Sequence, residues 1–421
     1  MQGRSLLPRL ADLPEFGGRS NIAQFAWYGL QGGTHSVDGF RIYPAGADHY
    51  GNDVIGAHTK DFGANIVVSL IDVWVMKNTA EQIAPALWCP WLPIDHDPVP
   101  DAVLNSLKGA HMPLTYSKWG HELLKGAGVD NRYIPHGVET NTYCVNPDIT
   151  SVQRFKTAFL CCTGHLALMV AANKRYPYRK AFHVQLRDWA KFAKDKPDAR
   201  LYLHTEPTPM YGGLDLPKLC TSLGIADKVR FPDRYQYYKG LPAEFLAMVY
   251  NAADVLMANS MSEGFGIPII EAQACGIPVV TTDFSAMPEL VRWGYKIAPA
   301  DMFWTPMQAW QAWPDVHGIT DALHELHEQW HDNGGAWNME QRLRISAQIH
   351  KEFSWDSIVR DQWAPFITEI ADAAPPLPQP VQPKPLPTVE TKKPAKRGRI
   401  TAVSFPVNAN GENNETVEVT A

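Results

Sequence analysis

The sequence predicts an α/β protein with two Rossmann-like doubly wound domains that face a cleft, followed by a disordered C-terminal tail. Short apolar runs alternate with helical patterns from residue 39 to residue 135, and the alternation restarts near residue 159. Such alternation is typical of parallel sheets covered by helices, and two such units create a cleft between them. From residue 373 the chain becomes rich in Pro and Lys and has no core-forming pattern.

The bulk composition indicates an intracellular, water-soluble protein. The chain has 421 residues, enough for two domains, and its net charge of −6 gives no electrostatic case for binding nucleic acid. Its six cysteines show no disulfide-like spacing, which is typical of a reduced, cytoplasmic protein. No apolar run approaches the roughly 20 residues that span a membrane, and we expect no signal peptide.

The N-terminal domain is expected over residues 1–155. Its first 15 residues contain no convincing strand, and a Gly turn then precedes a helical pattern from about Asn21 to Leu30. The remaining elements alternate regularly. We expect strands at 39–43, 66–70, 87–92, 113–116 and 133–135, with helices near 52–62, 100–108 and 118–126.

The C-terminal domain is expected over residues 156–352. Its predicted strands are 159–162, 201–204, 229–231 and 254–257, and its predicted helices are 181–193, 215–223 and 241–250, with a loop at 163–179. After residue 300 the pattern is helical, with helices at 321–332, 338–351 and 356–371. We expect the segment 353–372 to pack back on the N-terminal domain. The tail, 373–421, contains a basic part at 392–399 that could contact an acidic partner or could be a solvated linker.

The stretch Ser260–Thr282 is one helix-to-strand step with an anion-binding end. Pro268 suits the start of a helix and Gly276 its end. The free N–H groups at such a start favour a bound anion such as phosphate. Two carboxylates, Glu263 and Glu271, lie eight positions apart. They could be acids favoured by the helix dipole, or their oxygens could hold the two hydroxyls of a sugar diol.

Two further patterns suggest metals, and for each we prefer a reading without one. Asp95-His96-Asp97 spells DxD, but it lies between prolines after an apolar strand, so we expect a cleft role for Asp95 or His96. The segment 327–331 matches HExxH. Here Leu323, Leu326 and Trp330 form the buried stripe of a helix, so we expect the histidines at or near solvent. No metal site is predicted.

The run from Ser262 to Val280, SEGFGIPIIEAQACGIPVV, resembles the signature of the family-4 retaining glycosyltransferases of the GT-B architecture. Further similar segments occur in the same order along the chain. They are YSKWG (116–120), YIPHGVE (133–139), RK (179–180), ADV (253–255) and PEL (288–290).

The resemblance implies transfer of a sugar from a nucleotide sugar to an acceptor hydroxyl, with retention of configuration and without a metal ion. No cofactor is expected beyond the donor, a UDP- or GDP-sugar, and the acceptor stays open. The implied alternatives are a non-catalytic nucleotide-sugar-binding or assembly module and a nucleic-acid-modifying sugar transferase. The acidic balance of the chain argues against the last.

The resemblance also implies roles for single residues. The implied catalytic residues are Asp95 and His96, near the reacting carbon and the acceptor, and Glu263, at the donor sugar. Glu271 would hold the ribose hydroxyls. The implied remaining donor contacts are Gly18 across the cleft, Arg179 and Lys180 at the diphosphate, and the loop residues Gly264, Phe265 and Gly266.

Overall fold

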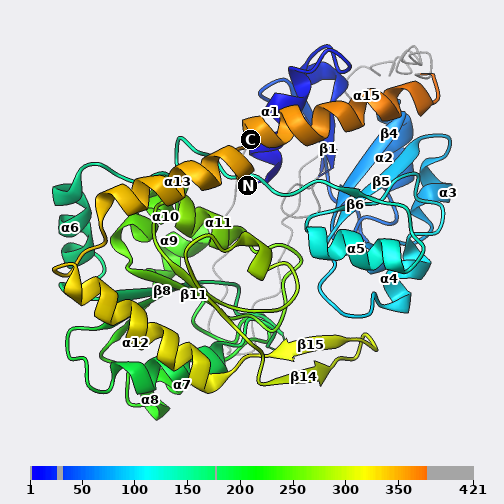
Figure 1. Cartoon of the computed structure of the whole chain (residues 1–421). Coiled ribbons are helices and arrows are strands. Elements are labelled where there is room, and N and C mark those ends of the chain that lie inside the picture. Colours follow the sequence, from blue (N-terminus) through cyan, green and yellow to red (C-terminus); the bar gives the residue numbers. More distant parts are fainter. Residues whose placement is uncertain (1, 26–31, 176–177, 377–421) are drawn as a thin grey trace, which may run out of the picture. The chain divides into compact units, whose positions relative to one another are not determined.

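The computed structural model describes residues 2–25, 32–175 and 178–376, all of which lie in one compact unit of the chain (Figure 1). It is an α/β structure with parallel sheets, as the sequence predicts. The predicted tail, 373–421, lies outside the described residues except for its first four positions.

The larger sheet has six parallel strands. In spatial order they are β10 (Val229–Arg230), β9 (Arg200–His204), β8 (Leu166–Val170), β11 (Val255–Ala258), β12 (Val279–Thr282) and β13 (Gly294–Ile297). Counted along the chain, this is the order 3-2-1-4-5-6 of the doubly wound dinucleotide-binding fold. The strand order reverses between β8 and β11, and ligands bind such sheets at that point, outside the carboxyl ends of the strands.

Both faces of this sheet are covered by helices. On one face Ala167 and Met169 of β8 pack with α7 (Phe182–Ala193), α8 (Leu216–Ser222) and α12 (Val316–Asp332). On the other face Leu166 and Leu168 pack in a cluster with four other helices of this half. These are α6 (Ile149–Ala158), α10 (Ala243–Ala252), α11 (Ile267–Ala274) and α13 (Met339–Phe353), while α9 (Arg234–Lys239) follows β10.

The N-terminal half contains a four-stranded parallel sheet and a smaller three-stranded sheet. The first has the order β4 (Ile66–Leu70), β5 (Leu87–Leu92), β6 (Leu114–Thr115) and β7 (Arg132–Tyr133). The second has β3 (Phe40–Tyr43) between β1 (Ala23–Phe25) and β2 (His35–Val37). The helical segments of this half are α1 (Gln2–Ala11), η1 (Arg19–Asn21), α2 (Ile55–Phe62), η2 (Val73–Val75), α3 (Thr79–Ile83), α4 (Asp101–Ser106) and α5 (Lys118–Gly126).

The last helices contact the N-terminal half. They are α14 (Trp355–Ile358), a π-helical turn η4 (Val359–Trp363) and α15 (Ala364–Ala373), which continue the orange run in Figure 1. Trp363 is fully buried, and its ring centroid lies 5.1 Å from that of Trp91 on β5. Arg132 on β7 pairs with Glu369 at 2.5 Å. Ser354 caps α14 by accepting a hydrogen bond from the Ser357 amide.

Two predicted elements are wrong. Residues 159–162, expected to form a strand, instead make a turn after the end of α6, in which Cys161 has a φ of 50°. The strand is β8, Leu166–Val170, within the segment predicted as a loop. Helices cover β8 on both faces, which explains why its sequence, LALMV, is apolar throughout. The helix predicted from about Asn21 contains strand β1 instead, and its positions 26–31 lie outside the described residues.

Two further segments differ from the sequence-based expectation. Residues 2–11, for which no element was predicted, form α1, and Leu6 and Leu10 are buried in the main core. The region after residue 300, expected to be helical, begins with the antiparallel hairpin β14 (Asp301–Trp304) and β15 (Trp310–Trp313). The two strands pair with each other, and Trp310 also pairs through its backbone with Asp97 outside the hairpin.

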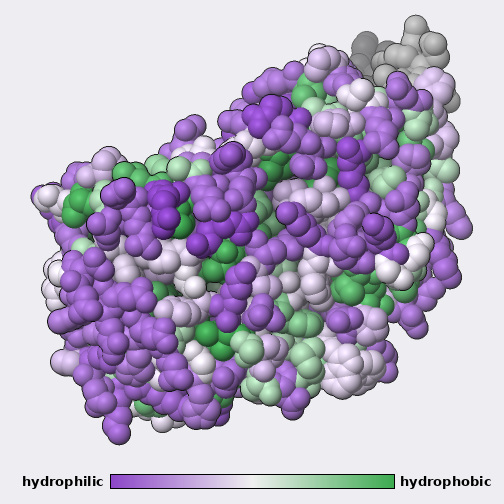
Figure 2. Space-filling view, viewed as in Figure 1, coloured by the Kyte–Doolittle hydropathy of each residue, from purple (hydrophilic) through white to green (hydrophobic). Residues whose placement is uncertain are grey.

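The surface is largely polar. Figure 2 shows a mostly hydrophilic face on which apolar residues form small, separate areas. Within the described ranges, no helix is both long enough and apolar enough to cross a bilayer.

Candidate functional site

A pocket lies at the point where the larger sheet reverses its strand order. The ends of β8 and β11 contribute Val170 and Ala258, and the start of α11 contributes Gly266 and Pro268. The polar residues that line it are Lys180, Gln185, Ser260 and Glu263. Because this is where doubly wound sheets bind ligands, topology and lining chemistry indicate the same place.

The start of α11 is shaped by Gly266. Its φ of 111° is in the left-handed region, which a side chain strongly disfavours, and it lets the loop turn directly into the helix. Pro268 occupies the first turn of α11, where its missing N–H leaves no helix bond unmade. The unpaired amides of this turn and the helix dipole attract an anion.

Glu263 is the centre of a charged cluster at the pocket wall. Its Oε2 accepts a hydrogen bond from Arg179 Nη1 at 2.9 Å. Its Oε1 accepts one from Lys180 Nζ and one from Ser260 Oγ, the latter at 2.6 Å. The backbone amide of Glu263 donates to Ser285 Oγ at 3.0 Å. Both carboxylate oxygens and the backbone are therefore held in place.

The cluster shifts the proton affinities of its members. Burial alone would raise the pKa of Glu263, but attraction to Arg179 and Lys180 outweighs it and lowers this pKa to about 2. For Lys180 burial is the larger effect, and its pKa is lowered although Glu263 opposes the shift. Glu263 is thus an anion over the physiological range, and it is paired with the two cations.

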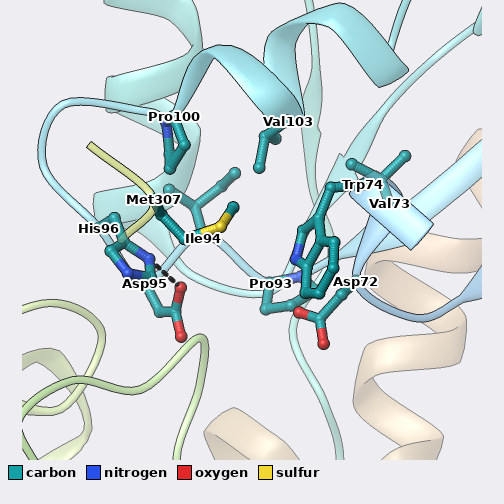
Figure 3. A pocket seen from close by; sticks show the side chains of 10 residues that line it. All are labelled: Asp72, Val73, Trp74, Pro93, Ile94, Asp95, His96, Pro100, Val103 and Met307. Carbon is teal, nitrogen blue, oxygen red and sulfur yellow. Dashed lines mark hydrogen bonds and ion pairs between the residues drawn. The ribbon is translucent and has the colours of Figure 1, made fainter. Parts of the chain in front are cut away.

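Asp95 and His96 lie beside this cluster, after the end of β5. Figure 3 shows their side chains together, with His96 Nδ1 2.7 Å from Asp95 Oδ1. Asp95 Oδ2 lies 3.9 Å from Arg179 Nε. Burial would raise the pKa of Asp95, but the His96 hydrogen bond and the Arg179 charge lower it. The structure therefore brings together Asp95, His96, Arg179, Lys180 and Glu263.

A second pocket opens at Asp95 and His96, at the carboxyl ends of β4 and β5. It is lined by these two residues and by Asp72, Trp74, Ile94 and Met307, among others (Figure 3). Asp72 and Trp74 follow β4, while Met307 comes from the tip of the β14–β15 hairpin. Burial, and then repulsion from Asp95, raises the pKa of Asp72. Arg179 lies between the two pockets.

Three other predicted site residues, Glu271, Phe265 and Gly264, are packed against other residues of the fold. Glu271 is buried on α11, and the Tyr250 hydroxyl donates to its Oε2 at 2.9 Å. Burial raises its pKa to about 7, although the Tyr250 hydrogen bond opposes the shift. Phe265 is buried in the main core, 5.3 Å from the ring of His136. A Cβ on Gly264 would lie 2.3 Å from Pro93 Cβ, so this glycine permits a close backbone approach.

Gly18 is not brought to the pockets. It has a φ of 127° and precedes the short turn η1. Neither Gly18 nor Glu271 is among the described residues that line the two pockets. Their predicted contacts with a donor remain predictions.

Sequence reasoning missed several members of the site. Ser260 and Ser285 position Glu263, and Gln185 accepts a hydrogen bond from the Asn259 amide at 3.1 Å while lining the first pocket. Asp72 was detectable, since a polar residue just beyond the carboxyl end of a parallel strand is a signal for a site. A serine in a loop carries no comparable signal.

The HExxH segment lies on α12, whose apolar stripe is buried as predicted. Leu323, Leu326 and Trp330 are buried in α12, whereas His331 is exposed and His327 is half-buried. In the described part of the chain, no group of three His, Cys, Asp or Glu side chains is arranged to hold a metal ion.

The comparisons with known proteins bear on the fold and on the class of protein. Residues 165–325 match the family described as Glycosyl transferases group 1. The sucrose-phosphate synthase of Thermosynechococcus elongatus superposes with a TM-score of 0.64, at 16% identity, over 88% of this chain and 93% of that one. This chain resembles the GT-B glycosyltransferases. The Anabaena protein Alr3699/HepE in complex with UDP-glucose shares the GT-B fold as well, with a TM-score of 0.59 at 15% identity, over 89% of this chain and 96% of that one.

Curated relatives match a part of this chain. The D-inositol 3-phosphate glycosyltransferase of Streptomyces bingchenggensis is 34% identical over 145 residues, which are 34% of this chain. That of Mycobacteroides abscessus is 44% identical over 88 residues, which are 20% of this chain and 18% of the relative. The chain spans 26% of the length of the Streptomyces relative.

Proposed function

We propose that this protein transfers a sugar from a nucleotide-sugar donor to an acceptor hydroxyl. The observation that carries the proposal is the position of Glu263, Arg179 and Lys180 at the switch point of a doubly wound sheet, beside the start of α11. Cations and free backbone amides bind a nucleoside diphosphate. A carboxylate held in a fixed position accepts hydrogen bonds from the hydroxyls of a sugar. This pocket contains both kinds of group.

The residues divide the work by charge. Arg179 and Lys180 neutralise the diphosphate as its negative charge grows during bond cleavage. Glu263 is fixed by both cations and by Ser260, so its oxygens are oriented before a sugar hydroxyl arrives. In this proposal Glu271 binds the ribose hydroxyls, which requires its hydrogen bond with Tyr250 to be shared or exchanged.

The chemistry we propose retains the configuration at the anomeric carbon. The bond between that carbon and the diphosphate oxygen breaks, and the acceptor oxygen bonds to the carbon from the same face. The acceptor proton passes to the departing phosphate oxygen, so atoms and charge balance. Asp95 and His96 orient the acceptor hydroxyl beside the reacting carbon. Asp95 Oδ2 lies 3.9 Å from Arg179 Nε, and in this proposal Arg179 binds the diphosphate.

The finer assignments belong to the same proposal. The donor is a UDP- or GDP-hexose, the reaction uses no metal ion, and the enzyme acts in the cytoplasm. The resemblance of the donor half to group 1 glycosyl transferases supports the donor class. The acceptor class is not contained in that half, because the acceptor meets the N-terminal residues.

The test is a screen of UDP-, GDP-, ADP- and TDP-sugars for thermal stabilisation, followed by nucleotide release with and without added EDTA. A ligand that binds only the native state raises its melting temperature. We expect one donor class to stabilise the wild type and Lys180→Ala to lose this shift, with turnover about 10²-fold lower. Lys125→Ala, which changes an exposed lysine on α5, is the matched control.

Each outcome has a definite meaning. Wild-type turnover in the Lys180→Ala variant would contradict the site assignment. Stabilisation by a nucleotide sugar without release of nucleotide over long incubation would instead favour the non-catalytic binding module. Turnover that required a nucleic acid as acceptor would favour the nucleic-acid-modifying alternative.

A further inference from the structure

The β14–β15 hairpin connects the larger sheet to the acceptor-side pocket. Trp310 on β15 pairs through its backbone with Asp97, with N···O distances of 3.1 and 2.7 Å. Gln311 Nε2 donates to the Asp95 carbonyl oxygen at 3.4 Å, and Met307 at the hairpin tip lines the pocket. The hairpin therefore forms one margin of the pocket that contains Asp95 and His96 (Figure 3).

Three strongly exposed tryptophans lie in this region, Trp74 in the pocket lining and Trp304 and Trp310 on the hairpin that borders it. Trp304 and Trp310 are 45% and 41% exposed and face each other across the hairpin, with ring centroids 4.8 Å apart. Trp74, on the opposite margin, lines the pocket and is 45% exposed. A tryptophan left exposed gives up the stability that burial of its indole would add to the fold. Exposed aromatic surface at the rim of a pocket is therefore typical of a ligand contact.

The charges at this pocket disfavour an anionic ligand. Asp72 and Asp95 both line it, and Asp97 and Asp301 lie at the hairpin that borders it. Arg179 lies 3.9 Å from Asp95 Oδ2, but it also donates a hydrogen bond to Glu263, which lines the donor pocket. A phosphate group here would meet two carboxylates beside one cation that Glu263 already pairs, whereas carboxylates are good acceptors for hydroxyl hydrogen bonds.

We propose that Trp74, Trp304 and Trp310 form the acceptor-binding platform of this protein and that the acceptor is an uncharged saccharide. A sugar ring has an apolar face of C–H groups, which can pack on an indole, and a rim of hydroxyls, which Asp72 and Asp95 can bind. This inference rests on the proposed function and names its acceptor class. The charges that favour a neutral sugar also argue against a nucleic-acid acceptor at this pocket.

The test measures acceptor binding directly, by saturation-transfer NMR with maltose, cellobiose, lactose and diacetylchitobiose. Glucose 6-phosphate and a dT10 oligonucleotide are the anionic probes. We expect at least one disaccharide to bind and the anionic probes to bind more weakly. Trp304→Ala, Trp310→Ala and Trp74→Ala should each weaken this binding about five-fold or more, while Trp304→Phe should retain part of it.

Phe159→Ala is the matched control, because Phe159 is 69% exposed but lies at the end of α6. The proposal is overturned if no neutral disaccharide binds, if the tryptophan variants bind it as the wild type does, or if an anionic probe binds more tightly. The donor screen separates the two ideas. If nucleotide sugars neither stabilise the wild type nor turn over, the proposed function fails. If they do and the tryptophan variants still bind sugar normally, this inference alone fails.

Discussion

Glu263 and Glu271 show how strongly environment separates two identical side chains eight positions apart. Glu263 lies between two cations, and its pKa falls to about 2. Glu271 is buried beside the hydroxyls of Tyr250 and Tyr143, and burial raises its pKa to about 7. A buried carboxyl without a cation is more stable when it keeps its proton. One acid is thus a fixed anion and the other titrates near neutrality.

Glu271 should make the stability of the protein fall with rising pH. The folded state holds this proton up to about pH 7, whereas the unfolded chain releases it near 4.5. The folded state therefore binds more protons between these values, and the free energy of unfolding decreases as pH rises through this window. We expect Glu271→Gln, whose amide oxygen can still accept from Tyr250, to remove a loss of up to about 3 kcal/mol.

Urea unfolding at pH 5 and pH 8 measures this difference. Glu340→Gln, at an exposed position of α13, is the control and should keep the wild-type pH dependence. Equal pH dependence in the Glu271→Gln variant and the wild type would show that Glu271 is ionised throughout.

Much of the donor side of the site could be predicted from the sequence, and the acceptor side could not. The stretch 262–280 contains its own turn, helix start and helix stop, and the structure has these elements where they were expected. The Glu263 cluster also joins the predicted Arg179 and Lys180. Asp72 and Trp74 follow β4, whereas Met307 comes from the β14–β15 hairpin, and only the folded chain brings these residues together at one pocket.

At the scale of elements, helix α12 shows how a motif can be produced by packing alone. Its buried stripe of Leu323, Leu326 and Trp330 requires polar residues on the remaining positions, and histidines happen to fill three of them. The HExxH spacing is then a consequence of the helical period.

We therefore predict effects of very different size on stability for two substitutions in α12. Leu326→Ala should destabilise the protein by about 2–5 kcal/mol, because it opens a cavity in the core. His331→Ala should change stability by less than about 0.5 kcal/mol, since its side chain is exposed. Thermal unfolding and nucleotide release measure both effects. A loss of activity on His331→Ala at unchanged stability would contradict the structural reading of the motif.

At the scale of the whole molecule, the two sheets are held together through the site itself. Ser262 Oγ donates to the Asp95 carbonyl oxygen, Trp310 pairs with Asp97, and Phe265 packs on His136. Gly264 allows the closest approach, because its missing side chain leaves room for Pro93. The residues that bracket Glu263 therefore also position the N-terminal half.

Gly264→Ala should disturb this contact. The new methyl group would lie 2.3 Å from Pro93 Cβ, so one of the two loops must shift. We expect a loss of about 1–3 kcal/mol in unfolding free energy, measured by urea titration. Gly126→Ala is the matched control, because no atom lies within 4 Å of the added Cβ and alanine favours the helix. Unchanged stability in both variants would show that the Gly264–Pro93 contact is not close in solution.

The sequence by itself determined the α/β class, most helices and strands, and the chemistry of the donor side, because these depend on local periodicity and on residues within short stretches. The tertiary structure decided which strand lies at the centre of the larger sheet, the burial of Glu271, and the hairpin that borders the acceptor pocket. Each of these depends on contacts between residues far apart in the chain. The strand error at 159–162 has the same origin, since β8 is apolar on both faces only because helices from elsewhere cover both.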